Sequence, residues 1–381
     1  MKELENFNRK KLGMGCMRLP VLDGDTEKID DVTVCKMVDY FMEQGFSYFD
    51  TAYPYHNQMS EGAVKRCLVE RYDRDKFYLA DKMPMWLAKE TADYEKIFET
   101  QLERCGVDYF DFYLLHALYK DRVTEAEKMG AFEFIRKMKE AGKIRHIGFS
   151  FHDSAEVLDE ILTNHPEVEF VQLQINYYDW DSENVQSRKC YEVAVKHGVP
   201  VIVMEPVKGG TLASLAPEAA SVLDALNPDE NGKSKASYAS FAVRYAASLE
   251  NVFMVLSGMS DFAQLSDNVS YMRDFKPLTE EEQTGIAKVV EELAKLPTIP
   301  CTKCRYCVEG CPQKINIPAL FQAYNNVVQF GDNEVSRRSY KNAVAERGLA
   351  SSCVSCGMCE EQCPQHLEIR ELLKDVTKMF E

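Results

Sequence analysis

The segment FSYFDTAYPY, residues 46–55, contains the pattern that decides the fold. Its apolar run at 46–49 follows Gly45 and ends at Asp50, and an amphipathic stretch at 31–44 precedes it. A short apolar run bounded by turn residues is typical of a buried strand, whereas the longer stretch has the spacing of a helix with one apolar face. The segment therefore predicts a helix, a turn and a buried strand in succession.

The same alternation continues on both sides, to about Phe275. Strand-like runs are expected at 11–14, 46–49, 77–80, 110–115, 144–149, 170–175, 200–204 and 252–256, with helical patterns at 31–44, 94–105, 125–141, 154–162, 183–197 and 237–249. Eight strands that alternate with helices indicate a parallel sheet closed as a barrel. An open doubly wound sheet is the alternative, but no GxGxxG follows the first strand. We therefore predict an α/β fold in which residues 1–275 form a (β/α)₈ TIM barrel.

The pattern changes after residue 275. One helix is expected at 278–296, where Thr279 and Glu282 form a capping box and Pro297 and Pro300 end the helix. We assign residues 276–300 to a helical linker. Residues 301–381 then form a small, mainly helical domain, with helices at 317–330 and 335–347.

This last domain contains two copies of the motif C-x₂-C-x₂-C-x₃-C-P, CTKCRYCVEGCP at 301–312 and CVSCGMCEEQCP at 353–364. Three cysteines at these gaps can surround one iron–sulfur cubane, whereas the fourth ligates the other cluster. Structural zinc is the alternative, but zinc sites use four ligands in two pairs. The motifs predict one [4Fe–4S] cluster on Cys301, Cys304, Cys307 and Cys363, and a second on Cys353, Cys356, Cys359 and Cys311. The spacing resembles that of bacterial two-cluster ferredoxins, which implies a ferredoxin-like domain whose clusters serve electron transfer or, alternatively, only hold the domain together.

Composition restricts the partners and the compartment. With 45 Lys and Arg against 61 Asp and Glu, the net charge of −16 argues against nucleic acid or an anionic membrane as a partner. No run of 18 apolar residues and no apolar secretory segment are present, so we expect a cytoplasmic protein. Thiols stay reduced there, so the scattered cysteines are expected in the core, with Cys16 near the cofactor. These cysteines are Cys16, Cys35, Cys67, Cys105 and Cys190.

Four polar residues lie at or just after the ends of consecutive predicted strands. Asp50 ends the second strand, Tyr55 follows in the next loop, Lys82 ends the third strand, and His116 ends the fourth. In a barrel these strand ends meet at the mouth, where catalytic groups lie. Each residue alone has an ordinary structural explanation, so the prediction depends on the four occurring together.

The four residue types suit carbonyl reduction, because a carbonyl that accepts a hydride also needs a proton. Tyr55 can donate it, although a tyrosine pKa near 10 is roughly three units above neutral pH. An ammonium about 4 Å away can stabilise the phenolate by about 4 kcal/mol, so we expect Lys82 to lower the pKa of Tyr55. Asp50 is expected to hold Lys82, and His116 to orient the substrate oxygen.

These motifs, DTAYPY at 50–55, ADK at 80–82 and LLH at 114–116, resemble the tetrad of the aldo-keto reductases over residues 11–268. The resemblance implies a (β/α)₈ barrel, NADP or NAD bound without a Rossmann fold, and reduction of an aldehyde or ketone. The segment LGMGCMR at 12–18 resembles the branch of that family with a C-terminal cluster module. The cofactor-binding residues that it implies are Gly15, Cys16, Met17, Asp50, Ser150, Gln172, Met204, Pro206, Lys208, Ser257, Gly258, Met259, Gln264 and Asn268.

Three positions depart from the family pattern. Phe151 replaces the usual asparagine after Ser150, and Met204 replaces a tyrosine that commonly stacks on the nicotinamide. Asp261 stands in the loop that usually carries a basic residue for the 2′-phosphate, so NADP and NAD both stay open. Two loop residues also stay open: His56 faces substrate or solvent, and Trp86 is a candidate pocket wall.

Three hypotheses for the function follow. The first is NAD(P)H-dependent reduction of a small carbonyl substrate by the tetrad. The second is a reductase that receives electrons from an electron-transfer protein, ferredoxin or flavoprotein, through the clusters. Since a hydride carries two electrons and each cluster one, coupling them requires a bound flavin or a radical intermediate. The third is a cofactor-binding redox sensor, against which the intact tetrad argues.

Overall fold

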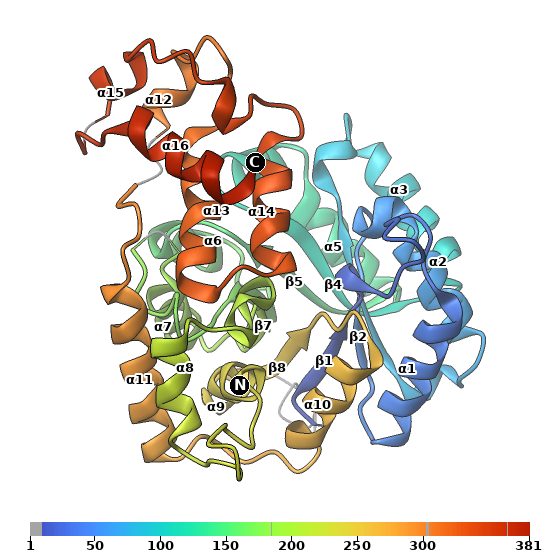
Figure 1. Ribbon diagram of the computed structural model, residues 1–381. Coiled ribbons are helices and arrows are strands. Elements are labelled where there is room, and N and C mark those ends of the chain that lie inside the picture. The colour runs from blue at the N-terminus through green and yellow to red at the C-terminus, as the bar shows by residue number, and fades with distance from the viewer. Residues whose placement is uncertain (1–9, 184, 302–304, 364) are drawn as a thin grey trace. The chain divides into compact units, whose positions relative to one another are not determined.

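The computed structural model describes residues 10–183, 185–301, 305–363 and 365–381. Its eight parallel strands close into a barrel in the order β1 to β8, so the predicted TIM barrel is confirmed and the open sheet is excluded (Figure 1). The strands are β1 Leu12–Gly15, β2 Tyr48–Asp50, β3 Tyr78–Met83, β4 Phe110–Leu118, β5 Ile144–Phe151, β6 Phe170–Gln174, β7 Val201–Met204 and β8 Val252–Ser257.

Helices connect consecutive strands and lie outside them, as Figure 1 shows for α1 and α3. One expected helix, 125–141, is split into α4 and α5 because Gly130 has a left-handed φ of 75°. The helices up to residue 272 are α1 Asp31–Glu43, α2 Ser60–Val64, α3 Ala92–Cys105, α4 Lys120–Lys128, α5 Ala131–Glu140, α6 Ala155–Asn164, α7 Ser187–Lys196, α8 Pro217–Asp224, α9 Tyr238–Ser248 and α10 Phe262–Met272.

Large apolar side chains form one of the buried clusters of the barrel. Tyr48, Phe112, Phe170 and Met254, from four different strands, belong to it. Side chains of alternate strands fill such barrels in layers, so the interior is a packed core. Gly148 belongs to the same packing, because a Cβ there would lie 2.5 Å from the carbonyl oxygen of Phe170. This layer of the barrel interior is therefore filled by apolar and aromatic side chains.

By its internal contacts the chain divides into two compact units, Met1–Pro206 with Ser240–Leu278, and Val207–Ala239 with Thr279–Glu381. This differs from the expected 1–275, 276–300 and 301–381, because residues 207–239 join the C-terminal part. The expected linker is a packed helix, α11 Glu280–Lys295, whose Gly285 lies against Leu226 beyond the end of α8. Its capping box is present, with Thr279 accepting from Glu282 N at 3.2 Å and Glu282 from Thr279 N at 2.8 Å.

The rest of the second unit is helical, as expected. Ile317, Leu320, Phe321 and Leu373 are among the residues of its buried apolar core. The expected helices at 317–330 and 335–347 correspond to α13 and α14. The elements are η7 Lys208–Ala213, α12 Tyr306–Glu309, α13 Ile317–Phe330, α14 Glu334–Val344, η8 Ala350–Ser352, α15 Met358–Glu361 and α16 Ile369–Phe380. Within the described residues, no helix has the length and apolar character needed to cross a membrane.

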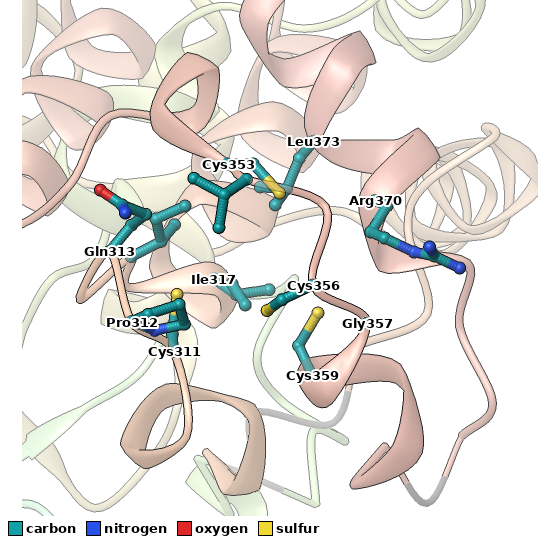
Figure 2. Close-up of a pocket in the computed structure, with 12 residues that line it drawn as sticks. Cys311, Pro312, Gln313, Ile317, Cys353, Cys356, Gly357, Cys359, Arg370 and Leu373 are labelled. Carbon is teal, nitrogen blue, oxygen red and sulfur yellow. The ribbon is translucent and has the colours of Figure 1, made fainter.

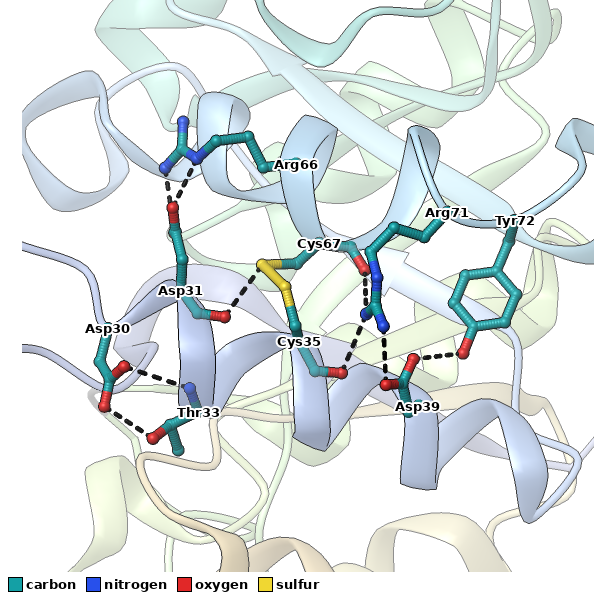
Figure 3. The surroundings of a disulfide bond; sticks show 9 residues. All are labelled: Asp30, Asp31, Thr33, Cys35, Asp39, Arg66, Cys67, Arg71 and Tyr72. Atoms are coloured by element: carbon teal, nitrogen blue, oxygen red, sulfur yellow. Dashed lines mark hydrogen bonds and ion pairs between the residues drawn. A yellow bond between two sulfur atoms is a disulfide. The ribbon is translucent and has the colours of Figure 1, made fainter.

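Two of the scattered cysteines do not match the expectation of reduced thiols. Cys35 of α1 and Cys67 of the π-helix η4 (Lys65–Val69) form a disulfide, because these elements lie side by side with the two Cα atoms 4.6 Å apart (Figure 3). Arg71 donates to the carbonyl oxygens of both cysteines, at 3.2 and 3.3 Å, and pairs with Asp39 at 2.8 Å. The remaining scattered cysteines, Cys16, Cys105 and Cys190, are buried free thiols.

Candidate active site

A buried ion pair lies at the ends of β2 and β3. The register pairs Asp50 with Ala80, so Lys82 lies two residues further along β3 on the same face. Lys82 Nζ donates to Asp50 Oδ1 at 2.6 Å and to the carbonyl oxygen of Thr51 at 2.8 Å. The two side chains are only 1% and 3% exposed. A buried ammonium needs such partners, so Asp50 and Thr51 hold Lys82 in its charged form.

Tyr55 and His116 complete the site. Tyr55 begins the short helix η3 (Tyr55–Gln58), and its Oη accepts from Lys82 Nζ at 3.1 Å. His116 lies near the end of β4, with its ring centre 6.1 Å from that of Tyr55 and 5.3 Å from that of Trp86. The structure therefore brings the four expected residues together and places Trp86 beside them.

The pKa of Tyr55 differs in direction from our expectation. Burial raises it above its ordinary value of 10, and the Lys82 ammonium only partly opposes this rise. Burial also disfavours the charge of Lys82, but Asp50 and then Tyr55 raise the pKa of Lys82 overall. Lys82 is already paired with Asp50, whose negative charge offsets part of the stabilisation that the ammonium gives to the Tyr55 phenolate. At neutral pH the site holds a charged lysine beside a protonated tyrosine.

His116 is neutral at pH 7. Burial, followed by the charge of Lys82, lowers the pKa of His116 well below 6.5. Its Nδ1 atom is buried and has no hydrogen-bond partner within the described residues. Buried polar atoms are nearly always paired in folded proteins, so this nitrogen marks a place for a ligand atom.

Ser150 and Gln172 lie on adjacent strands, paired in the register of β5 and β6. Ser150 Oγ accepts from Ala117 N at 2.7 Å, which leaves its hydroxyl proton available to a ligand. Gln172 Nε2 donates to Asp50 Oδ2 at 3.4 Å, and among the described residues its amide oxygen makes no hydrogen bond. Both side chains are buried, as is Phe151, which replaces the usual asparagine. A carboxamide could use these two polar groups.

The expected residues at the end of β1 lie beside the pair. Gly15 is in register with Asp50, and Cys16 and Met17 follow in η2 (Cys16–Arg18). Burial raises the pKa of Cys16 to about 12, with a further contribution from Asp50, so its thiol is uncharged. Met17 is instead 52% exposed.

The other expected cofactor residues follow β7 and β8. Met204 ends β7 and Pro206 comes two residues later, whereas Lys208 begins η7 in the second unit. Ser257 ends β8, and Gly258 and the buried Met259 follow it.

Polar groups of α10 are satisfied within their own helix. Asp261 caps α10, and its Oδ2 accepts from Gln264 Nε2 at 2.8 Å. Asn268 Nδ2 donates to the carbonyl oxygen of Gln264 at 2.8 Å, and Tyr271 donates to Asn268 Oδ1. A ribose at Gln264 or Asn268 would therefore compete with existing hydrogen bonds.

The sequence did not settle the roles of His56 and Arg122. Leu19 N donates to His56 Nε2 at 3.0 Å, and the other ring nitrogen lies 2.9 Å from the carbonyl oxygen of Thr26. His56 therefore holds the loop after β1. Arg122 lies just before the expected helix at 125–141, where no motif distinguishes it. Its guanidinium carbon lies 4.7 Å from the ring centre of Trp86.

In the second unit, the cysteines line two hollows. Figure 2 shows Cys311 facing the hollow formed by Cys353, Cys356 and Cys359, so the fourth cysteine of the first motif lies with the first three of the second. Cys301, Cys307 and Cys363 line the other hollow, and Cys304 lies outside the described residues. Ile317 lines both.

Each hollow is walled by apolar side chains and has an arginine among its lining residues, Arg370 in the first and Arg305 in the second. In the part of the chain that the structure describes, no three His, Cys, Asp or Glu side chains converge as a single metal ion requires. The thiols surround each hollow instead. Sulfur ligands of this kind suit iron–sulfur clusters.

A closed parallel barrel with an Asp–Lys pair, a tyrosine and a histidine at its strand ends has the architecture of a barrel oxidoreductase, here fused to a cysteine-rich module. The model of the Aldo/keto reductase family matches residues 11–291, and that of the 4Fe-4S dicluster domain matches residues 300–367. The chain belongs to the aldo/keto reductase family and carries a C-terminal 4Fe-4S dicluster domain.

Curated relatives agree with this assignment. An aldo-keto reductase of Schizosaccharomyces pombe whose name specifies NADP(+) is 26% identical over 224 residues, covering 55% of this chain and 62% of its own length. One from Mycolicibacterium vanbaalenii is 26% identical over 273 residues, covering 70% and 87%. This chain thus spans less than two thirds of the first relative.

Solved structures show the same fold. An aldo-keto reductase from Bacillus halodurans in its holo form superimposes with a TM-score of 0.58 and 24% identity, covering 73% of this chain and 91% of that one. One from Klebsiella pneumoniae in complex with NADPH has a TM-score of 0.58 and 18% identity, covering 74% and 90%.

Proposed function

We propose that this chain is an NAD(P)H-dependent reductase of a small aldehyde or ketone, with Asp50, Tyr55, Lys82 and His116 as its catalytic residues. The observation that carries the proposal is the contact of one buried ammonium, Lys82 Nζ, with both Asp50 and Tyr55. A bound reduced nicotinamide supplies the hydride to the carbonyl carbon. Tyr55 gives its proton to the carbonyl oxygen, and the products are an alcohol and the oxidised nicotinamide.

Lys82 stabilises the charge that this step creates. When Tyr55 loses its proton, a phenolate forms 3.1 Å from the ammonium. At an effective dielectric near 20, their attraction is about 5 kcal/mol. His116 is uncharged at neutral pH, so it can donate one hydrogen bond to the carbonyl oxygen without competing for the proton.

The nicotinamide site that we propose includes Ser150 and Gln172, whose free hydroxyl proton and amide oxygen match a carboxamide. NADP is supported by the NADP(+) in one relative's name and by the NADPH in the Klebsiella pneumoniae complex. Asp261 argues for NAD, because its carboxylate would repel a 2′-phosphate. Steady-state comparison of NADPH and NADH with one aldehyde decides between them.

Tyr55→Phe tests the tetrad, because it removes only the proton donor. We expect kcat for a test aldehyde to fall by about 100-fold or more, as for loss of a general acid, while cofactor affinity changes little. Cofactor binding is measured by fluorescence quenching, with Tyr53→Phe as the matched control. A Tyr55→Phe variant with the wild-type kcat would refute the proposed role.

We further propose that the module holds two [4Fe–4S] clusters, on the two crossed sets of four cysteines that the motifs predict. The hollow with Cys311, Cys353, Cys356 and Cys359 supports this pairing. Anaerobic purification should give about eight iron atoms per chain. About one or two zinc atoms without iron would favour a zinc module instead.

A second candidate function is electron transfer between the clusters and the barrel site, supported by the dicluster domain on the same chain. It requires a partner electron-transfer protein and a flavin or radical step. Visible spectra of the anaerobic protein, before and after NADPH or NADH, distinguish the two. Bleaching of the cluster band by nicotinamide would favour coupling, whereas NADPH or NADH consumption with aldehyde and an unbleached band would favour the reductase alone.

A further inference from the structure

Arg122 is held rigidly near the expected substrate position. It lies in the first turn of α4, and its guanidinium carbon is 4.7 Å from the ring centres of both Trp86 and Tyr119. Arg122 Nη1 donates to the carbonyl oxygen of Ala117 at 2.9 Å. Contacts with two aromatic rings and one backbone oxygen fix the guanidinium before any ligand binds, which lowers the entropic cost of using it.

Two contacts connect Arg122 with the catalytic residues. Trp86 contacts Arg122 and also lies beside His116, because the centres of the Trp86 and His116 rings are 5.3 Å apart. Ala117, the acceptor for Arg122, directly follows His116, and its N–H donates to Ser150 Oγ at 2.7 Å. Arg122 therefore lies at the same end of the barrel as the proposed carbonyl and nicotinamide positions.

Arg122 has no acidic partner within the described residues. Other arginines at this end of the barrel do: Arg18 pairs with Glu205 and Arg104 with Glu61, each at 3.2 Å. Arg122 therefore differs from these two arginines, whose charge is offset by a carboxylate. A guanidinium has five N–H donors, and within the described residues Arg122 uses one of them, in its hydrogen bond to the carbonyl oxygen of Ala117. The remaining donors are available to an anion.

We propose that the substrate of this site carries an oxyanion, a carboxylate or a phosphate, which Arg122 binds while the carbonyl lies between Tyr55 and His116. This inference rests on the proposed function and names its substrate class, an anionic aldehyde or ketone. The planar fork of arginine matches both kinds of oxyanion through paired hydrogen bonds. Trp86 covers the apolar part of the substrate between the two groups.

The first test compares related aldehydes with and without an oxyanion. One pair is 4-carboxybenzaldehyde and methyl 4-formylbenzoate, and the other is D-glyceraldehyde 3-phosphate and D-glyceraldehyde. For Arg122→Gln, the ratio of kcat/KM for the anionic over the neutral substrate should fall by about 10- to 100-fold, mainly through KM. The substrate pair whose ratio falls identifies the oxyanion as a carboxylate or a phosphate. Arg122→Lys should recover part of the fall in that ratio.

Arg136→Gln is the matched control, because Arg136 pairs with Glu133 and Glu140 on α5. It should leave both ratios unchanged. Ratios that stay within about twofold in Arg122→Gln would overturn the inference, as would an equal loss in Arg136→Gln. An equal fall for charged and neutral substrates would also overturn it, since it would indicate a structural role for Arg122.

The second test does not require hydride transfer. The chain has two tryptophans, so Trp180→Phe leaves Trp86 as the only indole. Benzoate or inorganic phosphate should then change the Trp86 fluorescence in a saturable, salt-sensitive way, and Arg122→Gln should abolish the change. If no aldehyde is reduced but this binding persists, the reductase proposal fails and the anion site remains. If aldehydes are reduced, and Arg122→Gln changes neither the kcat/KM ratios nor the Trp86 fluorescence response, only the proposed anion site is refuted.

Discussion

Tyr55 controls how the proposed reduction depends on pH. Burial raises the pKa of its phenol above 10, although the Lys82 ammonium opposes the rise. A proton donor acts only while it is protonated, so a raised pKa shifts the loss of activity to higher pH. We expect kcat/KM for carbonyl reduction to stay level between about pH 7 and 9 and to fall only above about pH 10. A pH profile at saturating cofactor checks this, and a fall centred between pH 6 and 8 would assign the proton to another group.

Glu169 predicts a pH-dependent stability. Its carboxylate accepts from Ile147 N at 3.0 Å, from Lys139 and, at 3.4 Å, from His146. Burial opposes its charge, but the hydrogen bonds from His146, Lys139 and Ile147 lower its pKa to about 2. A carboxyl with a lowered folded-state pKa stabilises the fold above its unfolded value of about 4.3, and this contribution is lost as the pH falls toward 2.

Glu169→Gln should therefore lower the free energy of unfolding by about 1–3 kcal/mol at pH 7. The difference from wild type should shrink as the pH falls from about 4.3 toward 2. Urea unfolding at pH 7, 5, 4 and 3 measures it. Glu140→Gln is the control, because its exposed pair with Arg136 should contribute less than about 1 kcal/mol. An equal destabilisation at every pH would contradict the titration argument.

Individual residues could be predicted from the sequence where the strand register alone brings them together. Asp50 and Lys82 follow from two neighbouring strand ends. The direction of the Tyr55 pKa could not be predicted, because burial depends on the loops that cover the phenol. The place of Arg122 also depends on tertiary contacts, with Trp86 lying 36 positions earlier in the sequence.

Strand packing gives a prediction for β5. Gly148 has no room for a side chain, since a Cβ would lie 2.5 Å from the carbonyl oxygen of Phe170 and 2.7 Å from its ring. Gly148→Ala must push β6 away, and we expect it to destabilise the protein by about 1–3 kcal/mol or more, as overpacking does. Gly62→Ala is the control: outside its own helix backbone, its Cβ would meet no backbone atom within 4 Å, only the exposed guanidinium of Arg66 at 3.1 Å, and alanine favours the helix. Urea unfolding of both variants measures the effect, and equal midpoints would contradict it.

The strands were predicted closely because each is a buried apolar run between turns. For example, the expected run at 252–256 corresponds to Val252–Ser257. The helices were less certain at breaks such as Gly130, where an uninterrupted amphipathic pattern hides a left-handed residue. Helix α11 had its own start signal, and Thr279 and Glu282 indeed cap each other.

At the scale of the whole chain, sequence patterns predicted the two kinds of domain but not every long-range pairing. The motifs indicated a cysteine module, and the barrel followed from the repeated alternation. Two features require knowledge of which elements pack together: the grouping of 207–239 with the C-terminal part, and the Cys35–Cys67 disulfide. Composition could not predict the disulfide. The expectation that cytoplasmic thiols stay reduced contains no information on whether α1 and η4 lie side by side.

The crossed pairing of the two cysteine motifs is the most specific prediction at this scale. In the structure, Cys311 of the first motif lines the hollow of Cys353, Cys356 and Cys359. If this pairing holds, Cys311→Ser with Cys353→Ser damages one cluster, whereas Cys311→Ser with Cys301→Ser damages both. The first double variant should retain about four iron atoms per chain and the second close to none.

Sequential pairing, in which each motif holds its own cluster, predicts the opposite result for the two double variants. Iron analysis and low-temperature electron paramagnetic resonance of the dithionite-reduced proteins measure the outcome, with Cys190→Ser, a buried thiol of the barrel, as the control. Crossed ligation ties residues 301–311 to residues 353–363, so losing either cluster should loosen both segments. Hydrogen exchange should therefore increase around both motifs in each double variant, while the barrel strands β1 to β8 keep their protection.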